Sequence, residues 1–266
     1  MKLLYTTMLF YEICILQKRT IRMSTTRPYT TVFFDLDGTL LPLDTSEFMK
    51  TYTASLGAYA HDNGMDAQAT MDALFKGVMA MAENDGSRSN HDLFWETFSR
   101  VAGVDAQQTE PLFDEYYRTR FDEVARVATP SPESARAIAA LKERGYTLAI
   151  TTMPMFPLEA VHARIRWAGL DPDDFLFVTD YATAHSIKPK PAYYEEALRR
   201  AGVDASEVLM VGNHTREDGG AYRVGTDIYF VTDHVIESDE GLNLEDHKHG
   251  TLAEFADFCE ALPNLR

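Results

Sequence analysis

Hydrophobic and polar positions divide the chain after residue 28 into three parts with different patterns. The first part is short. Residues 30–34 form an apolar, partly β-branched run that ends in the sequence Asp35-Leu36-Asp37-Gly38-Thr39. A run of this length followed by a glycine-containing turn predicts a buried strand and a sharp reversal of the chain.

The second part, residues 44–128, holds no convincing strand, and its apolar side chains recur at helical spacing. Asp44 begins a capping-box sequence, Asn90 can cap another helix, and Gly103 can end it. The aromatic side chains at this spacing include Phe48, Tyr52, Phe94, Phe98, Phe113, Tyr116, Tyr117 and Phe121. We predict that these rings form the core of a small helical bundle and are not a stacking platform for a ligand.

The third part, residues 129–266, alternates between short apolar runs and helical segments. The predicted strands are 146–151, 175–179, 208–211 and 228–231. The predicted helices begin at Pro132, cover 158–168 and 191–201, end near Gly225, and follow a capping box at 251–254. This alternation predicts an α/β fold with a doubly wound parallel sheet, in which ligands bind beyond the carboxyl ends of the strands.

We therefore expect two structural parts. Residues 29–43 and 129–266 form the α/β core, and residues 44–128 form a helical insert placed after the first strand. Residues 1–28 form an N-terminal tail, of which residues 1–22 are apolar but contain Glu12 and lack a small-residue cleavage site. We interpret residues 1–22 as an upstream translation artefact or a loose tail, with a cleaved export signal as the alternative.

Composition narrows the class of function. The 266 residues include 25 Lys or Arg and 41 Asp or Glu, which gives a formal net charge of −16. Such a chain is a poor match for nucleic acid or for an anionic membrane surface, and we expect neither partner. The two cysteines, Cys14 and Cys259, have no metal-like spacing, which favours a reducing, cytoplasmic location.

Polar residues that can take part in catalysis or ligand binding follow several predicted strands. Asp35 and Asp37 come directly after the first strand, and two carboxylates at this spacing can share one ligand cluster or simply form an Asx-rich turn. Thr152 follows the strand at 146–151, where its hydroxyl can bind a phosphate oxygen, although threonine is common at strand ends.

Two further segments add a cation and oxygen ligands. Lys188 stands in the stiff sequence Lys188-Pro189-Lys190-Pro191 and can neutralise an anionic cluster, or lie in solvent as an ordinary surface lysine. After the strand at 208–211, Asn213, Glu217 and Asp218 offer oxygens suited to magnesium. Acidic residues in the first turn of a helix also have a purely structural explanation.

Taken in order, these residues resemble the four motifs of the haloacid dehalogenase superfamily, most of whose members are magnesium-dependent phosphatases. The stretch FFDLDGT resembles motif I, Thr152 after LAIT resembles motif II, Lys188 in KPKP resembles motif III, and residues 212–218 resemble motif IV. The resemblance implies a Rossmann-like core, with the helical insert as a cap of the C1 type. Stretches such as FWETF, RIRWAGL and KPKPAYYEE are similar to a branch of the superfamily without an assigned substrate.

The resemblance also implies a role for each residue. Asp35 would attack phosphorus and form an aspartyl-phosphate, and Asp37 would act as general acid and base. Thr152 and Lys188 would hold phosphate oxygens. Mg2+ would be bound by Asp35, by the backbone carbonyl of Asp37 and by motif IV, where Asn213 and Asp218 are the expected ligands.

Two positions depart from the superfamily pattern. Asn213 replaces the first acid of motif IV, which removes one negative charge from the metal site. Met153 stands where asparagine is usual, so no side-chain amide is available there to bind phosphate. Both changes leave the nucleophile and the acid/base residue intact, so they bear on the rate more than on the type of reaction.

We therefore expect a phosphomonoester hydrolase that acts on a small phosphorylated metabolite. The alternatives are a binding or regulatory protein with weak or no catalysis, motivated by Asn213 and Met153, and a phosphomutase, which would also keep Asp37. Dehalogenases lack an acid at the position of Asp37, which disfavours dehalogenation. Substrate choice should lie in the cap, where Lys76 and Arg88 are the predicted anchors for an anionic substrate, or else ordinary surface charges.

Overall fold

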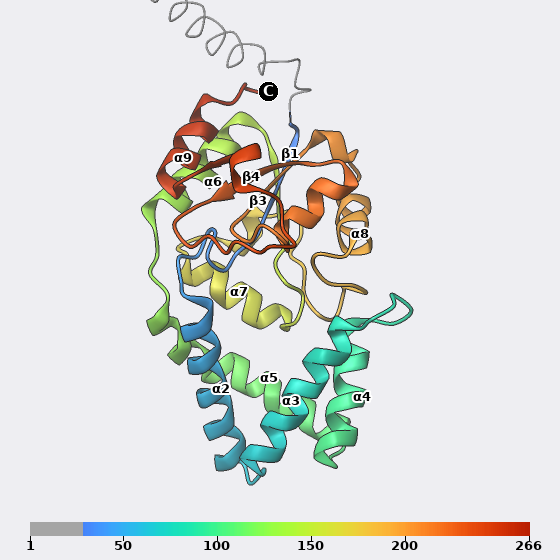
Figure 1. Cartoon of the computed structure of the whole chain (residues 1–266). Coiled ribbons are helices and arrows are strands. Elements are labelled where there is room, and N and C mark those ends of the chain that lie inside the picture. The colour runs from blue at the N-terminus through green and yellow to red at the C-terminus, as the bar shows by residue number, and fades with distance from the viewer. Residues whose placement is uncertain (1–28) are drawn as a thin grey trace, which may run out of the picture.

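The computed structural model describes residues 29–266, so the interpretation of residues 1–28 as a tail lies outside the described part of the chain. Within it, an α/β core stands above a bundle of helices (Figure 1). No helix among residues 29–266 has both the length and the hydrophobicity needed to cross a membrane.

The core is built on one parallel sheet of five strands in the order β2-β1-β3-β4-β5. The strands are β1 (Thr31–Phe34), β2 (Thr147–Ile150), β3 (Val208–Gly212), β4 (Asp227–Val231) and β5 (Lys248–Gly250). Phe34 lies opposite Ile150 of β2 and Val211 of β3, so three strands end at the same level. This order confirms the predicted doubly wound α/β sheet.

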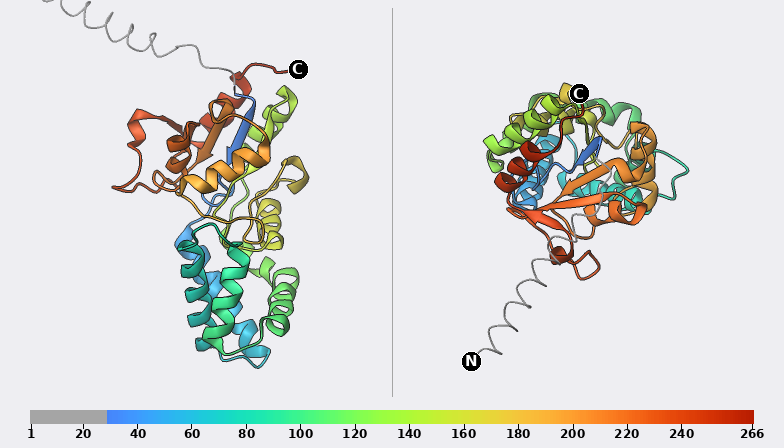
Figure 2. Two further views of the ribbon diagram at one scale, coloured as in Figure 1. Left: turned by 90° about the vertical axis from the view of Figure 1, so that its right-hand side faces the viewer. Right: turned by 90° about the horizontal axis from the view of Figure 1, so that it is seen from above.

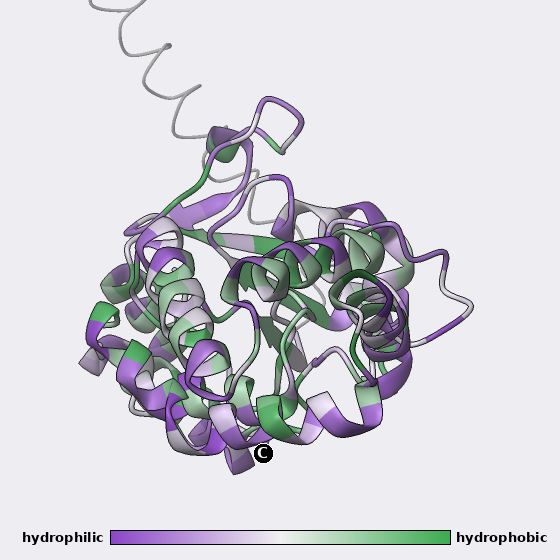
Figure 3. Ribbon diagram, turned by 90° about the horizontal axis from the view of Figure 1, so that it is seen from below, coloured by the Kyte–Doolittle hydropathy of each residue, from purple (hydrophilic) through white to green (hydrophobic). Residues whose placement is uncertain are grey.

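Alternate residues of the buried strands pack into two separate hydrophobic clusters, one on each face of the sheet. Val32 and Phe34 belong to the larger cluster, with side chains of α6, α7 and α9, whereas Phe33 packs with Tyr193 and Tyr194 of α8. The covering helices are α6 (Pro132–Arg144), α7 (Leu158–Trp167), α8 (Pro191–Ala201) and α9 (Leu252–Ala261). Figure 2 shows these helices around the sheet, and Figure 3 shows the hydrophobic strands at the centre with hydrophilic residues in the outer loops.

Short 3-10 helices complete the core. They are η2 (Pro172–Asp174), η3 (Ala205–Glu207), η4 (Asp218–Val224) and η5 (Leu244–Asp246).

The insert consists of α2 (Thr45–Asp62), α3 (Ala67–Ala82), α4 (Asn90–Ala102), α5 (Ala106–Thr119) and η1 (Phe121–Val127). Leu43 and Ala128 form an antiparallel bridge where the chain leaves the core and returns to it. The predicted aromatic core is present: Phe98 and Phe121 are fully buried, and the rings of Phe98 and Phe113 meet edge to face at 5.2 Å between centroids. Several other rings of the insert line a cavity, which the sequence does not reveal.

Three local features differ from the prediction. Residues 175–179 run beside β2 but do not form the predicted strand. The backbone N–H of Leu176 donates to Leu148 O at 2.7 Å, and only Val178 forms a β-bridge. Leu176 is 57% exposed at this edge of the sheet. Asn90 does not cap α4, because Ser89 does so and the buried Asn90 amide donates to Pro154 O and Ser186 O, at 3.2 Å each. Strand β5 is too short and polar for a hydrophobic pattern to predict.

Candidate active site

The candidate site lies at the carboxyl ends of three neighbouring strands. Asp35 follows β1, Thr152 follows β2 by two residues, and Asn213 follows β3. Since these strands are parallel and in register, the three segments leave the sheet on the same side. Lys188 reaches this edge from the loop before α8.

Lys188 forms the centre of a buried charge cluster. Its Nζ lies 2.7 Å from Asp35 Oδ1 and 2.7 Å from Asp218 Oδ1, and its side chain is 1% exposed. The second Asp218 oxygen accepts hydrogen bonds from the backbone N–H groups of Asn213 (3.0 Å) and His214 (2.9 Å). Asp218 also explains Gly212, where a Cβ atom would lie 2.2 Å from the Asp218 carboxyl group.

The charges of this cluster depend on one another. Burial alone would lower the pKa of Lys188, but Asp218 and Asp35 outweigh it and hold that pKa well above its ordinary value. Burial raises the pKa of the Asp35 carboxyl, and the charge of Lys188 opposes this shift. Lys188 therefore remains a cation, and it favours the ionised form of Asp35 in a site that would otherwise disfavour it.

Thr39 joins Asp35 to Asn213. Its Oγ1 donates toward Asp35 Oδ2 (3.2 Å) and Asn213 Oδ1 (3.3 Å), so both oxygens lie within reach of one hydroxyl. The Asn213 amide is oriented by its Nδ2, which donates to His234 O at 2.7 Å. Gly38 (φ 78°) makes room for this arrangement, because a Cβ atom there would lie 2.3 Å from Asn213 Nδ2.

Thr152 is 2% exposed, and its backbone is held firmly. The carbonyl oxygen of Thr152 accepts hydrogen bonds from Thr179 Oγ1 (2.9 Å) and Tyr193 Oη (2.7 Å). These two bonds hold the backbone just after β2 against Thr179 and against α8.

Asp37 pairs with Arg164 of α7, a residue that the sequence analysis missed. The two side chains form a short ion pair, and Arg164 is 1% exposed. Its guanidinium lies 4.5 Å from the centroid of the Phe156 ring, a cation–π contact. Burial raises the pKa of Asp37, whereas Arg164 opposes that shift. The sequence feature that could have revealed this pairing is the position of an arginine on the apolar face of the predicted helix 158–168.

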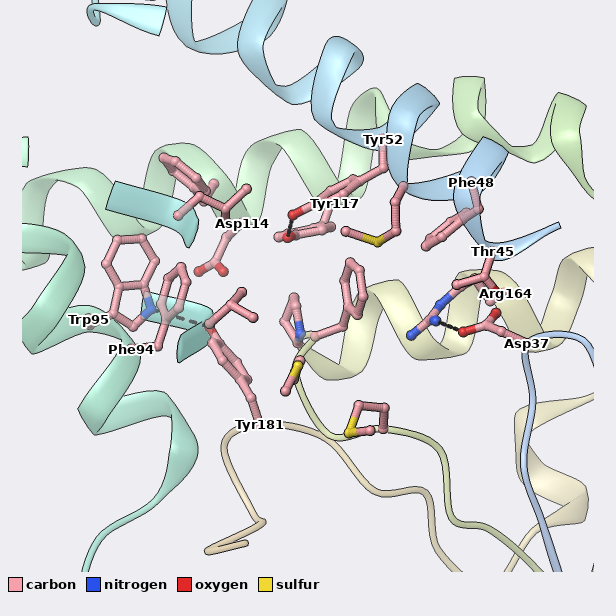
Figure 4. A pocket seen from close by; sticks show the side chains of 18 of the residues that line it. Asp37, Thr45, Phe48, Tyr52, Phe94, Trp95, Asp114, Tyr117, Arg164 and Tyr181 are labelled. Carbon is pink, nitrogen blue, oxygen red and sulfur yellow. Dashed lines mark hydrogen bonds and ion pairs between the residues drawn. The ribbon is translucent and has the colours of Figure 1, made fainter. Parts of the chain in front are cut away.

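A cavity of about 320 Å³ lies between the cap and the core and reaches Asp37, Arg164 and Glu217. Figure 4 shows the Asp37–Arg164 pair at one end of the cavity and Asp114 among aromatic rings toward the other. Its aromatic lining consists of Phe48, Tyr52, Phe94, Trp95, Phe113, Tyr117, Phe156 and Tyr181. Asp37 thus borders a space that can hold an organic ligand.

The predicted substrate anchors lie elsewhere on the cap. Lys76 is exposed on α3, and Arg88 forms a surface ion pair with Glu96. Neither residue is among those that line the cavity. Their assignment to substrate binding therefore gains no support, and the alternative of ordinary surface charges fits their positions.

The predicted metal ligands differ in how open they are. Both Asp218 oxygens are engaged by Lys188 and backbone N–H groups, which leaves Asp35 Oδ2 and Asn213 Oδ1 as the side-chain oxygens that face each other through Thr39. Within residues 29–266, no three His, Cys, Asp or Glu side chains gather as a metal site. The donors that fit a hard cation are therefore one carboxylate, one amide and backbone carbonyls.

Comparison with known proteins identifies the family of the chain. Residues 29–223 match the family model described as haloacid dehalogenase-like hydrolase. The chain is 26% identical over 202 residues to pyrophosphatase PpaX of Bacillus velezensis, covering 76% of this chain and 82% of that protein. It is 28% identical over 207 residues to glyceraldehyde 3-phosphate phosphatase of Pyrococcus abyssi, covering 73% and 77%.

Solved structures show the same fold with different chemistry. A HAD phosphatase from Thermococcus onnurineus aligns with a TM-score of 0.56 at 20% identity, covering 89% of this chain and 100% of that one. A 2-haloacid dehalogenase from Pseudomonas syringae aligns with a TM-score of 0.58 at 24% identity, covering 86% and 97%. At these identities the likeness establishes the fold and not the reaction.

Proposed function

Because the chain belongs to the haloacid dehalogenase-like hydrolase family, we propose that it is a magnesium-dependent phosphatase of small phosphomonoesters that works through an aspartyl-phosphate. The single observation that carries this proposal is the placing of two carboxylates at the end of β1. Asp35 is held by Lys188, and Asp37 borders the cavity two residues later. Phosphatase names among the sequence relatives agree with it.

In the proposed first step, an Asp35 oxygen attacks phosphorus and the bond from phosphorus to the ester oxygen breaks. Asp37, in its protonated form, transfers its proton to the departing oxygen, so the product leaves as a neutral alcohol. Burial favours this protonated form by raising the pKa of Asp37. In the second step Asp37 accepts a proton from water, the water oxygen attacks phosphorus, and Asp35 is released as a carboxylate with inorganic phosphate.

Lys188 and Thr152 complete the proposed phosphate site. The Lys188 ammonium offsets negative charge when the phosphate dianion approaches the Asp35 carboxylate, and it holds that carboxylate in one orientation. The Thr152 hydroxyl is assigned to a phosphate oxygen. Met153, which lines the cavity beside it, supplies no polar group for this purpose.

Magnesium would be held by Asp35 Oδ2, Asn213 Oδ1 and the backbone carbonyl of Asp37. When bound, it would neutralise charge between the carboxylate nucleophile and the phosphate. Asp218 is better assigned to positioning Lys188 and the turn after β3, because both of its oxygens are already hydrogen-bonded. With Asn213 neutral, we expect a weak site that fills only at raised magnesium concentrations.

The cytoplasmic location stays a prediction from cysteine content.

The alternative of a binding protein without turnover rests on the neutral Asn213 and on Met153. The test is release of inorganic phosphate from a chromogenic aryl phosphate and a panel of phosphomonoesters, with magnesium and with chelator. Turnover that requires a divalent metal and disappears in an Asp35→Asn variant supports the proposal. Equal phosphate release by the two proteins across several metals supports the binding protein instead.

Asn213→Asp is expected to lower the magnesium concentration needed for half-maximal rate by about tenfold, since it adds a negative ligand. Without metal the variant should be less stable, by about 1–3 kcal/mol, because its carboxylate cannot donate to His234 O. Magnesium titration of the rate and metal-free thermal unfolding measure the two effects. The control is Asn63→Asp, which loses a similar bond from Nδ2 to Tyr59 O at an exposed position. An unchanged magnesium requirement would remove Asn213 from the metal site.

A further inference from the structure

The cavity beside Asp37 has a different chemical character at each end. Its reacting end carries Arg164, Asp37 and Glu217, and the Arg164 guanidinium is its cation. Arg164 Nη2 and Asp37 Oδ1 are buried and have no hydrogen-bond partner within residues 29–266. A buried guanidinium nitrogen without a partner is costly to leave unsatisfied, so this end can accept a further oxygen of an anionic group.

The opposite end contains a carboxylate, Asp114 of α5. In Figure 4 its carboxyl group points into the cavity among the rings. No hydrogen bond or ion pair engages the Asp114 side chain in the described part of the chain, whereas the nearby Glu110 is paired with His91 at 2.6 Å. Burial raises the pKa of Asp114, and the charges of Glu110 and Glu159 add to this shift, while Arg118 and His91 oppose it. Arg118 and His91 are themselves paired with Glu115 and Glu110, and neither forms an ion pair with Asp114.

Aromatic rings surround the Asp114 end. Trp95 meets Phe94 and Phe113 edge to face, at 5.3 and 5.5 Å between ring centroids. The Trp95 Nε1–H donates to Tyr181 Oη at 3.3 Å, which fixes both rings in the wall. The faces of such rings carry partial negative charge and attract organic cations, most strongly when water is excluded. The walls and Asp114 therefore favour the same sign of ligand charge.

We propose that the cavity selects phosphate monoesters of amino alcohols, whose phosphoryl group lies at Asp35 and whose ammonium group lies between Asp114 and the aromatic walls. This inference rests on the proposed phosphatase function and names the substrate class for the same site. Glu217 and Asp37 do not contradict it, because both lie at the reacting end, where Arg164 pairs with Asp37 and the charge of Lys188 acts on Glu217.

The competing ligand class is a neutral aromatic or aliphatic phosphate ester, for which the apolar walls alone would suffice. An uncharged group at the far end would leave the Asp114 carboxylate partly desolvated and still without a partner. The size of the cavity also limits the choice. At about 320 Å³ the cavity lies at the small end of the range of roughly 300–1,000 Å³ that small-molecule sites span, which favours a small ester.

The test compares phosphocholine with its carbon isostere, 3,3-dimethylbutyl phosphate, which has the same shape and no positive charge. The wild-type protein is expected to show kcat/KM about tenfold higher for phosphocholine. Asp114→Asn should bring the two values to within about threefold of one another. The matched control, Glu115→Gln, removes a charge from a solvent-facing position of the same helix and should preserve the wild-type ratio.

Calorimetric binding of both esters to the Asp35→Asn protein separates recognition from turnover. Tighter binding of phosphocholine that depends on Asp114 supports the inference, even if no ester is hydrolysed and the proposed function fails. Hydrolysis of both esters at equal kcat/KM, with no effect of Asp114→Asn on their ratio, overturns the inference and leaves the phosphatase proposal intact. Equal binding of the two esters to Asp35→Asn also overturns it.

Discussion

Asp35→Asn is expected to lower metal-dependent phosphate release by at least about a thousandfold, because an amide oxygen is a poor nucleophile toward phosphorus. The substitution keeps the shape of the side chain and an oxygen that can accept the hydrogen bond from Lys188. In the wild-type protein Lys188 Nζ lies 2.7 Å from Asp35 Oδ1. The loss should therefore appear in kcat without a large loss of folded protein. Initial rates with saturating magnesium and thermal unfolding measure the two quantities.

Asp44→Asn is the matched control for this substitution. Asp44 caps α2 through a hydrogen bond to the backbone N–H of Glu47 (2.8 Å), and asparagine caps a helix about as well. Its rate should equal that of the wild type. If Asp35→Asn keeps a tenth or more of the wild-type rate, water attacks phosphorus directly or another group is the nucleophile, and the role assigned to Asp35 is wrong.

The end of β1 was predictable because local rules and tertiary structure agree there. Asp35 and Asp37 follow an apolar strand and lie in a glycine turn. They therefore lie at the carboxyl edge of any parallel sheet that contains this strand. The pairing of Lys188 with Asp35 follows from the same sheet edge, since a lysine fixed by neighbouring prolines can meet only what the strand ends present. The structure adds that Asp218 also forms an ion pair with Lys188. From spacing alone, Asp218 could have been either a metal ligand or an acidic residue in the first turn of a helix.

The cavity between the cap and the core was not predictable from the sequence for a physical reason. Asp114 and Trp95 belong to separate helices, and only the packing of those helices brings them to one space with Asp37. Helical periodicity tells which residues turn inward, but it does not distinguish a filled interior from a partly empty one. Lys76 and Arg88 were predicted from charge alone, and both lie where long cations usually lie, in solvent.

Arg164 falls between these cases. Its place on the apolar face of α7 is visible in the sequence, yet its partner, Asp37, lies 127 positions away and could have been any anion near that face.

The strand prediction for residues 175–179 failed for a related reason. They have a strand-like composition, but they lie at the outer edge beside β2, where only Val178 completes a bridge. Composition predicts the tendency to form a strand, and the neighbouring strand decides whether a ladder forms.

Lys188→Met is expected to reduce the free energy of unfolding at neutral pH by about 3–5 kcal/mol, in addition to removing activity. Methionine fills much of the same space, but it leaves the carboxylates of Asp35 and Asp218 buried together without a cation. Lys142→Met is the control, because it breaks only a surface pair with Asp174 and should cost far less. Urea unfolding at pH 7.5 measures both variants.

The same substitution should also strengthen the stabilising effect of acid on the folded protein. In the Lys188→Met protein the Asp35 carboxyl stays buried and loses the cation that opposes the rise of its pKa, so the folded state binds more protons than the unfolded state. Its stability should therefore increase as the pH falls from 7.5 toward 5, and adding Asp218→Asn should recover part of the loss at pH 7.5. A Lys188→Met protein that is as stable as the wild type at pH 7.5 would mean that Lys188 does not neutralise this cluster, and the charge arrangement proposed for the phosphate site would have to be abandoned.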